Sequence, residues 1–194
     1  YPTISLRRFG FTYEDLPAFH AAYFMLTLIF AGIFNLGFFA LLVVTHLFID
    51  FWRYRGTLHF SFGRAVHAVI RENVADVALF FVALCASVYL HSTMPFIATM
   101  TGAAKTRISL VRGLLILLPK LTILHHFLRI VFRLPEYLHT PSPRMKHGWT
   151  GMEKFLFALI LVAAAALSVS PIALHLTSAE MISMLKAELL PWRL

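Results

Sequence analysis

Four long apolar runs, separated by polar or basic segments, dominate the chain. They cover residues about 18–49, 74–92, 108–132 and 153–176. An α-helix rises 1.5 Å per residue, so about 20 apolar residues cross the roughly 30 Å hydrocarbon core of a bilayer. The pattern predicts an all-α integral membrane protein. We expect one transmembrane domain over residues 1–194, an antiparallel bundle of four transmembrane helices with short interfacial amphipathic helices.

The first run is too long for a simple span. From Ala18 to Ile49 it holds 32 residues without a charge. As one helix it would measure about 48 Å, so it must tilt, kink or protrude. Gly32 and Gly37, which flank the polar Asn35, are the predicted bend points.

The third run carries polar residues that lipid tolerates poorly. Arg112, Pro119 and Lys120 lie within it. Pro119 predicts a kink, and a re-entrant or interfacial helix is the alternative to a full span. Lys120 falls near mid-membrane, where an ionisable side chain is by default a functional-site hypothesis. Asp76 is a candidate partner, although a lysine that snorkels to the interface is the structural alternative.

Capping signals frame the C-terminal segments. Thr150 and Glu153, and again Thr177 and Glu180, have the spacing of a capping box. The first box precedes the fourth run, whose alanines and serines at 163–170 suit close helix contact. The second opens a helix at about 178–190 whose apolar face is expected in the interface.

The composition excludes a soluble protein. Residues are 59% hydrophobic and 13% charged, with a net charge of +8, against about 25% charged in soluble domains. Nine basic residues flank one side of the predicted topology and six the other. This bias places the basic loops 50–73 and 133–153 inside and both termini outside. A bacterial inner membrane and an organellar inner membrane fit equally.

The charge distribution also bears on partners. The basic residues are spread over several loops and form no single stripe, which argues against nucleic-acid binding. They favour contact with anionic lipid headgroups and bound lipids. Because the sequence begins at Tyr1 rather than Met, either an N-terminal segment is removed or the chain continues beyond this end.

Histidines are the first candidate chemistry. The predicted topology places His20 and His91 near the outer side and His46, His67 and His125 near the inner side. Opposed histidines on neighbouring helices resemble the dihaem cytochrome b anchors, which would imply haem b or quinone binding. The spacing favours interfacial histidines instead, since His20 and His46 would lie about 39 Å apart along a helix. His125 and His126 are adjacent, so they should point in different directions.

His46 and Asp50 form the second candidate. They are four residues apart, share a helix face and precede Arg53. Such a His–Asp pair can orient a metal ligand or a catalytic base, whereas a local Asp–Arg pair at a helix end is the structural alternative. The sequence holds no spaced metal motif, no Gly-x-Ser-x-Gly and no phosphate loop, so it predicts no metal site and no catalytic residue.

These observations favour a non-catalytic structural or accessory subunit of a larger membrane complex. Such a subunit would pack against other membrane protein subunits and lipid, and it would need no cofactor. A haem b- or quinone-binding redox anchor is one alternative. A small channel or transporter that uses Lys120, Arg112 and Asp76 is the other.

Overall fold

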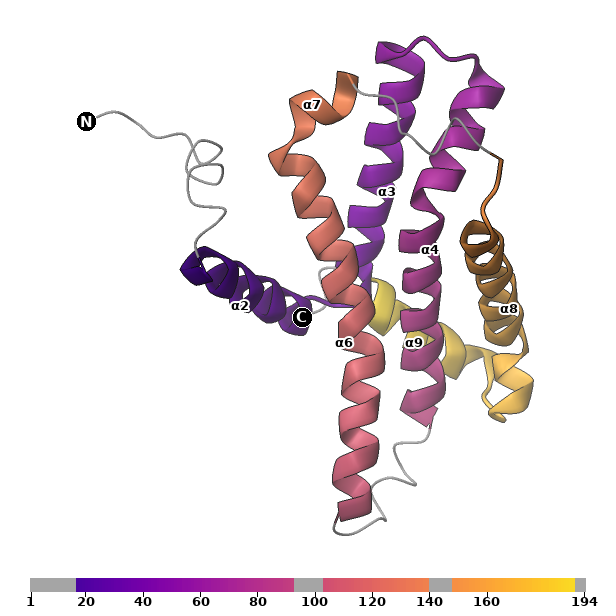
Figure 1. The fold of residues 1–194 in the computed structure, drawn as a ribbon. Helices are drawn as coiled ribbons and strands as arrows, with labels where there is room; N and C mark the ends of the chain where they lie inside the picture. The colour runs from indigo at the N-terminus through magenta and orange to yellow at the C-terminus, as the bar shows by residue number, and fades with distance from the viewer. Residues whose placement is uncertain (1–16, 93–102, 140–147, 191–194) are drawn as a thin grey trace.

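The computed structural model describes residues 17–92, 103–139 and 148–190, and within them every regular element is a helix. The helices are α2 (Pro17–Ile33), α3 (Leu36–Trp52), α4 (Phe62–Ser92), α6 (Ala103–Phe132), α7 (Leu134–His139), α8 (Gly151–Ala173) and α9 (Ser178–Leu189). A π-helical turn, η1 (Arg53–Thr57), continues α3. Figure 1 shows α3, α4, α6 and α8 running side by side, with α9 crossing behind α4 and α2 extending from the side of α6.

Four helical segments are long and apolar enough to cross a membrane. They are Leu36–Thr57, Phe62–Leu90, Gly113–Phe132 and Gly151–Ala173. This confirms the predicted all-helical class with four candidate spans. Large apolar side chains are exposed along α2, α6 and α8, as in Phe24, Leu118 and Val162. Such surfaces suit a protein whose surroundings are hydrocarbon.

The run expected as one helix over residues 18–49 is divided. α2 ends at Ile33 and α3 begins at Leu36, so the break falls between the two predicted bend glycines. Asn35 caps α3, because its side-chain oxygen accepts the backbone N–H of Phe38. Its amide nitrogen donates to the carbonyl of Leu190, just beyond α9. The Asn35 side chain therefore satisfies a backbone N–H that the break would otherwise leave unpaired, and the end of α9 supplies an acceptor for its amide group.

Lys120 contacts the same break. Its Nζ donates to the carbonyl of Phe34 over 2.8 Å and lies 5.6 Å from the ring centre of Phe39. α6 continues as one helix through Pro119, and Lys120 is level with the start of α3. Lys120 lies within the candidate span Gly113–Phe132, and its depth near mid-membrane stays a prediction.

The remaining helices pack on α4. Cys85 Sγ and Tyr89 OH of α4 donate to the carbonyls of Ala163 and Ala166 of α8, which confirms close contact at the small residues. Both capping boxes are formed, at Thr150 and Thr177. Through its partly buried Leu185 and Leu189, α9 packs against Leu36 and Leu84.

Candidate metal centre

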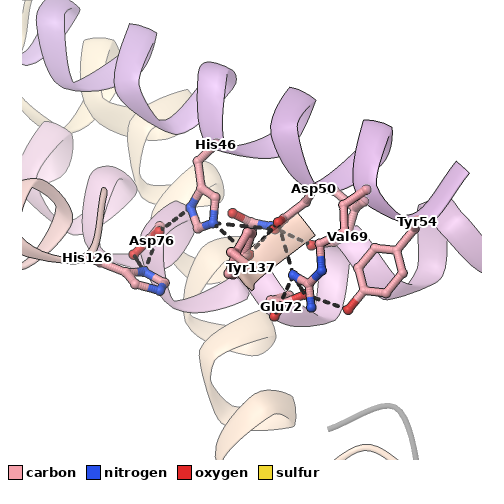
Figure 2. A network of polar contacts seen from close by, with 10 residues as sticks. His46, Asp50, Tyr54, Val69, Glu72, Asp76, His126 and Tyr137 are labelled. Carbon is pink, nitrogen blue, oxygen red and sulfur yellow. Dashed lines mark hydrogen bonds and ion pairs between the residues drawn. The ribbon is translucent and has the colours of Figure 1, made fainter. Parts of the chain in front are cut away.

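Ionisable side chains from several elements meet where α3 and α4 pass α6 and α7 (Figure 2). Residues three, four and seven positions apart share a helix face, which brings each set to one side of its helix. The cluster comprises His46 and Asp50 of α3, Arg53 of η1, Glu72 and Asp76 of α4, His126 of α6 and Tyr137 of α7. We call these seven side chains the ionisable cluster.

The carboxylate of Asp76 lies between two imidazoles. His46 Nδ1 is 3.0 Å from Asp76 Oδ2, and His126 Nδ1 is 2.9 Å from the same oxygen. One nitrogen or oxygen of each residue lies within 4.8 Å of the other two. His46 and Asp76 are buried, but the His126 side chain is 39% exposed. Three possible metal ligands thus converge from three helices.

The spacing fits a small transition-metal ion. Zinc binds histidine nitrogen and carboxylate oxygen at about 2.0–2.2 Å, so two ligands of a tetrahedral site lie about 3.3 Å apart. The Asp76 oxygen is already 2.9–3.0 Å from each histidine Nδ1. All three ligand atoms lie within 4.8 Å of one another, so side-chain rotation would bring them to bonding distance of one ion. Two nitrogens and one carboxylate are also the donor types that zinc and its neighbours prefer.

Asp50 supplies the support that metal-bound histidines usually have. A ligating imidazole commonly directs its second nitrogen at a carboxylate, which fixes the ring and its tautomer. Here His46 Nδ1 faces Asp76, while His46 Nε2 is 3.4 Å from Asp50 Oδ2. Asp50 is itself held by Asn73 Nδ2 and Tyr137 OH, which both donate to it.

Arg53 links this support to the end of the cluster. Its Nη1 donates to Glu72 over 3.3 Å and lies 3.6 Å from Asp50. Tyr54 OH also donates to Glu72, and the Arg53 guanidinium stacks 4.1 Å from the Tyr137 ring centre. Burial, reinforced by Asp50 and Glu72, raises the pKa of Tyr137. The phenol therefore stays protonated and donates a hydrogen bond.

The charges of the ionisable cluster do not balance. Asp50, Glu72 and Asp76 supply three carboxylates, and Arg53 supplies one guanidinium. The formal charge is −2 while both imidazoles are neutral. Uncompensated charge is costly in a buried site, so protonation of an imidazole or a carboxyl group, or a divalent cation, would offset it.

Of the other residues predicted for haem, His67 and His125 do not converge on this place. His67 Nε2 accepts from Trp149 Nε1 at 3.0 Å, and His125 Nδ1 lies 3.0 Å from Tyr23 OH on α2. His125 and His126 therefore point in different directions, as their adjacency required. The side chains of His20, His91 and Arg112 lie outside the part of the chain that the structure describes.

The predicted partners of buried charges also differ. Asp76 pairs with His46 and His126, whereas Lys120 bonds to the Phe34 carbonyl. His46, Asp50 and Asp76 were each singled out in the sequence, but not as one site. Neither His126 nor Tyr137 was expected there. The sequence does contain two pairs of ionisable residues four positions apart, His46–Asp50 and Glu72–Asp76. This spacing places each pair on one helix face, and it is the one local indication of the site.

Comparison with known proteins adds no identification: no protein-family model, no curated protein and no solved structure matches this chain.

Proposed function

We propose that this chain is a metal-dependent membrane protein that binds one divalent transition-metal ion, of the zinc type, through His46, Asp76 and His126. The observation that carries the proposal is the convergence of two histidine Nδ1 atoms on one buried carboxylate. The excess negative charge of the ionisable cluster and the Asp50 carboxylate behind His46 support it.

The ligand count favours a chemically active ion over a purely structural one. Structural zinc sites are closed by four protein ligands, whereas catalytic sites have three and keep one position for water or substrate. Among the residues that the structure describes, three ligands are at hand, and His126 is the exposed member. A metal with an open position can polarise a substrate oxygen or activate a bound water. We therefore favour metal-assisted chemistry at this site over the non-catalytic role that the sequence indicated.

Metal content is the direct test. The protein is purified in mild detergent without chelator, supplied with Zn²⁺, desalted and analysed by elemental mass spectrometry. We expect about one Zn²⁺ per chain, and less than a tenth of that in Asp76→Asn and His126→Ala. His67→Ala is the matched control, because His67 bonds to Trp149 outside the cluster. Equal zinc in wild type and Asp76→Asn, with both variants monodisperse and helical, would contradict the proposal.

We also propose that the four apolar helices insert as antiparallel spans with the basic loops inside. The positive-inside bias of the loops supports this orientation. Accessibility labelling of single cysteines placed at Arg64 and at Thr177 tests it, since only the former should be protected from an impermeant outer reagent.

Membership of a larger complex remains a second proposal. The observation in its favour is α2, an apolar helix that extends from the side of α6 (Figure 1) and exposes Phe24, Leu26, Ile29 and Ile33. Lipid alone would cover such a helix, but other membrane protein subunits would cover it equally well. Stoichiometric co-purification from native membranes in mild detergent tests this role, and recovery of the chain alone would contradict it.

A further inference from the structure

One face of α6 leads from the candidate metal centre to the end of the bundle. His126, Arg129 and Arg133 are spaced by three and four residues, so they share this face. Both arginines are exposed. Arg133 lies just past the helix, where its N–H still bonds to the carbonyl of Arg129. The exposed edge of His126 is therefore followed by two guanidiniums.

In the other direction the same face is apolar. Leu118, Leu115 and Val111 lie 8, 11 and 15 residues before His126, which returns them to its side of the helix. Their exposed fractions are 55%, 44% and 56%. We call this face the α6 stripe: Val111, Leu115 and Leu118 in its apolar half, and His126, Arg129 and Arg133 in its polar half.

The two halves match the shape and charge of one kind of molecule. An anionic phospholipid has a phosphate headgroup that guanidiniums bind well and acyl chains that need an apolar surface. Three apolar residues over 8 positions of α6 extend along about 11 Å of helix, a length that an acyl chain can follow. A soluble phosphate compound would use the guanidiniums but gain nothing from the apolar half.

Resting on the proposed function, we propose that the headgroup phosphate of an anionic phospholipid is the ligand that completes the metal centre. The lipid lies along the α6 stripe, and its phosphate meets Arg129 and the open position of the ion beside His126. The ligand class of the site is thus a lipid phosphate that arrives sideways from the bilayer.

Lipid binding to the Zn²⁺-loaded protein tests this inference. Full-length protein in a neutral detergent is titrated with mixed micelles that contain phosphatidylglycerol or phosphatidylcholine. A third titration adds inorganic phosphate to the protein in detergent alone. Binding is measured by native mass spectrometry. We expect phosphatidylglycerol to bind at least tenfold more tightly than phosphatidylcholine. Arg129→Ala should weaken phosphatidylglycerol binding about fivefold, the factor that one basic residue near an anionic surface contributes.

The matched control is Arg64→Ala, because Arg64 is an equally exposed arginine at the start of α4, away from the α6 stripe. It should leave the affinity within twofold. Arg129→Ala should keep part of the preference for phosphatidylglycerol over phosphatidylcholine, because the metal remains. Asp76→Asn, which lacks the metal, should lose that remaining part of the preference.

Each result decides between the two proposals. A protein that binds Zn²⁺ but shows the same affinity for both lipids overturns the lipid inference alone. Equal losses in Arg129→Ala and Arg64→Ala mean that general surface charge binds the lipid, which also overturns it. Inorganic phosphate that binds as tightly as phosphatidylglycerol identifies a soluble phosphate as the ligand instead. A protein without Zn²⁺ overturns the proposed function first.

Discussion

Two regions of this bundle bury polar groups that bond to different kinds of partner. At the helix break, the side chains of Asn35 and Lys120 bond to backbone groups of Phe38, Leu190 and Phe34. In the ionisable cluster, side chains bond chiefly to one another. A side chain that satisfies the backbone serves the fold, because an unpaired backbone group in lipid costs several kcal/mol. A side chain that is paired only with another ionisable group satisfies no backbone donor or acceptor, so the fold does not require it for that purpose.

The contrast separates fold from function. Mutual pairing of ionisable groups is rarely the most stable way to fill a core, because the cost of desolvating both charges offsets their attraction. Hydrophobic residues could have filled the space around His46 and Asp76 instead. The ionisable cluster is therefore the better candidate for chemistry, and the helix break for architecture. Lys120, which the sequence offered as a functional candidate, belongs to the helix break.

The largest effect is expected for Arg53→Ala. This change leaves the buried Asp50 and the partly buried Glu72 without their guanidinium, and breaking a buried pair by removing one partner costs about 3–5 kcal/mol. The free energy of unfolding, measured by denaturant titration in detergent, should fall by that amount. Arg64→Ala, an exposed arginine on α4, is the control and should stay within about 0.5 kcal/mol. If the free energy of unfolding falls by a similar, small amount in both variants, the guanidinium of Arg53 does not stabilise the ionisable cluster.

An intermediate effect is expected for Asp50→Asn, and it concerns the metal rather than the fold. Loss of the carboxylate behind a ligating histidine typically lowers metal affinity 10- to 100-fold. Competition with a chromogenic chelator measures the Zn²⁺ affinity. The control is Glu153→Gln, which weakens another buried ion pair, that of Arg71 with Glu153 at 3.1 Å. Glu153→Gln should lower stability without changing the Zn²⁺ affinity, whereas an equal affinity loss in both would remove the special role of Asp50.

The helices themselves could be predicted from the sequence. Runs of about 20 apolar residues and the boxes at Thr150 and Thr177 are local signals, and local signals specify helices and their ends. The division of the first run could be predicted in part, because a 32-residue uncharged run is too long for the bilayer. Its placement needed Lys120 and Leu190, which are far away in the sequence and supply the bonds that stabilise the break.

The candidate site could not be predicted because its ligands come from three helices. His46, Asp76 and His126 are separated by 30 and 50 residues, and no local motif encodes such distances. Helical periodicity does show that His46 and Asp50 share a face, and likewise Glu72 and Asp76. Which face meets which depends on the register of neighbouring helices. That register follows from the packing of side chains such as Phe39, Ile123 and Leu124, which hydropathy patterns do not resolve.

The smallest effect is expected for Lys120→Met, and it tests the other side of the comparison. Methionine keeps most of the apolar stem but loses the charged donor to the Phe34 carbonyl, at the C-terminal end of α2 where a cation is favoured. A hydrogen bond from a charged group contributes about 1.5 kcal/mol at the low end of its range. Unfolding in detergent should register that loss, while Lys154→Met, an exposed lysine of α8, should not. If Lys120 serves only the helix break, the Zn²⁺ affinity of Lys120→Met equals that of wild type. A Zn²⁺ affinity that falls along with stability would join the two regions into one site and return Lys120 to the functional role that its position in the sequence suggested.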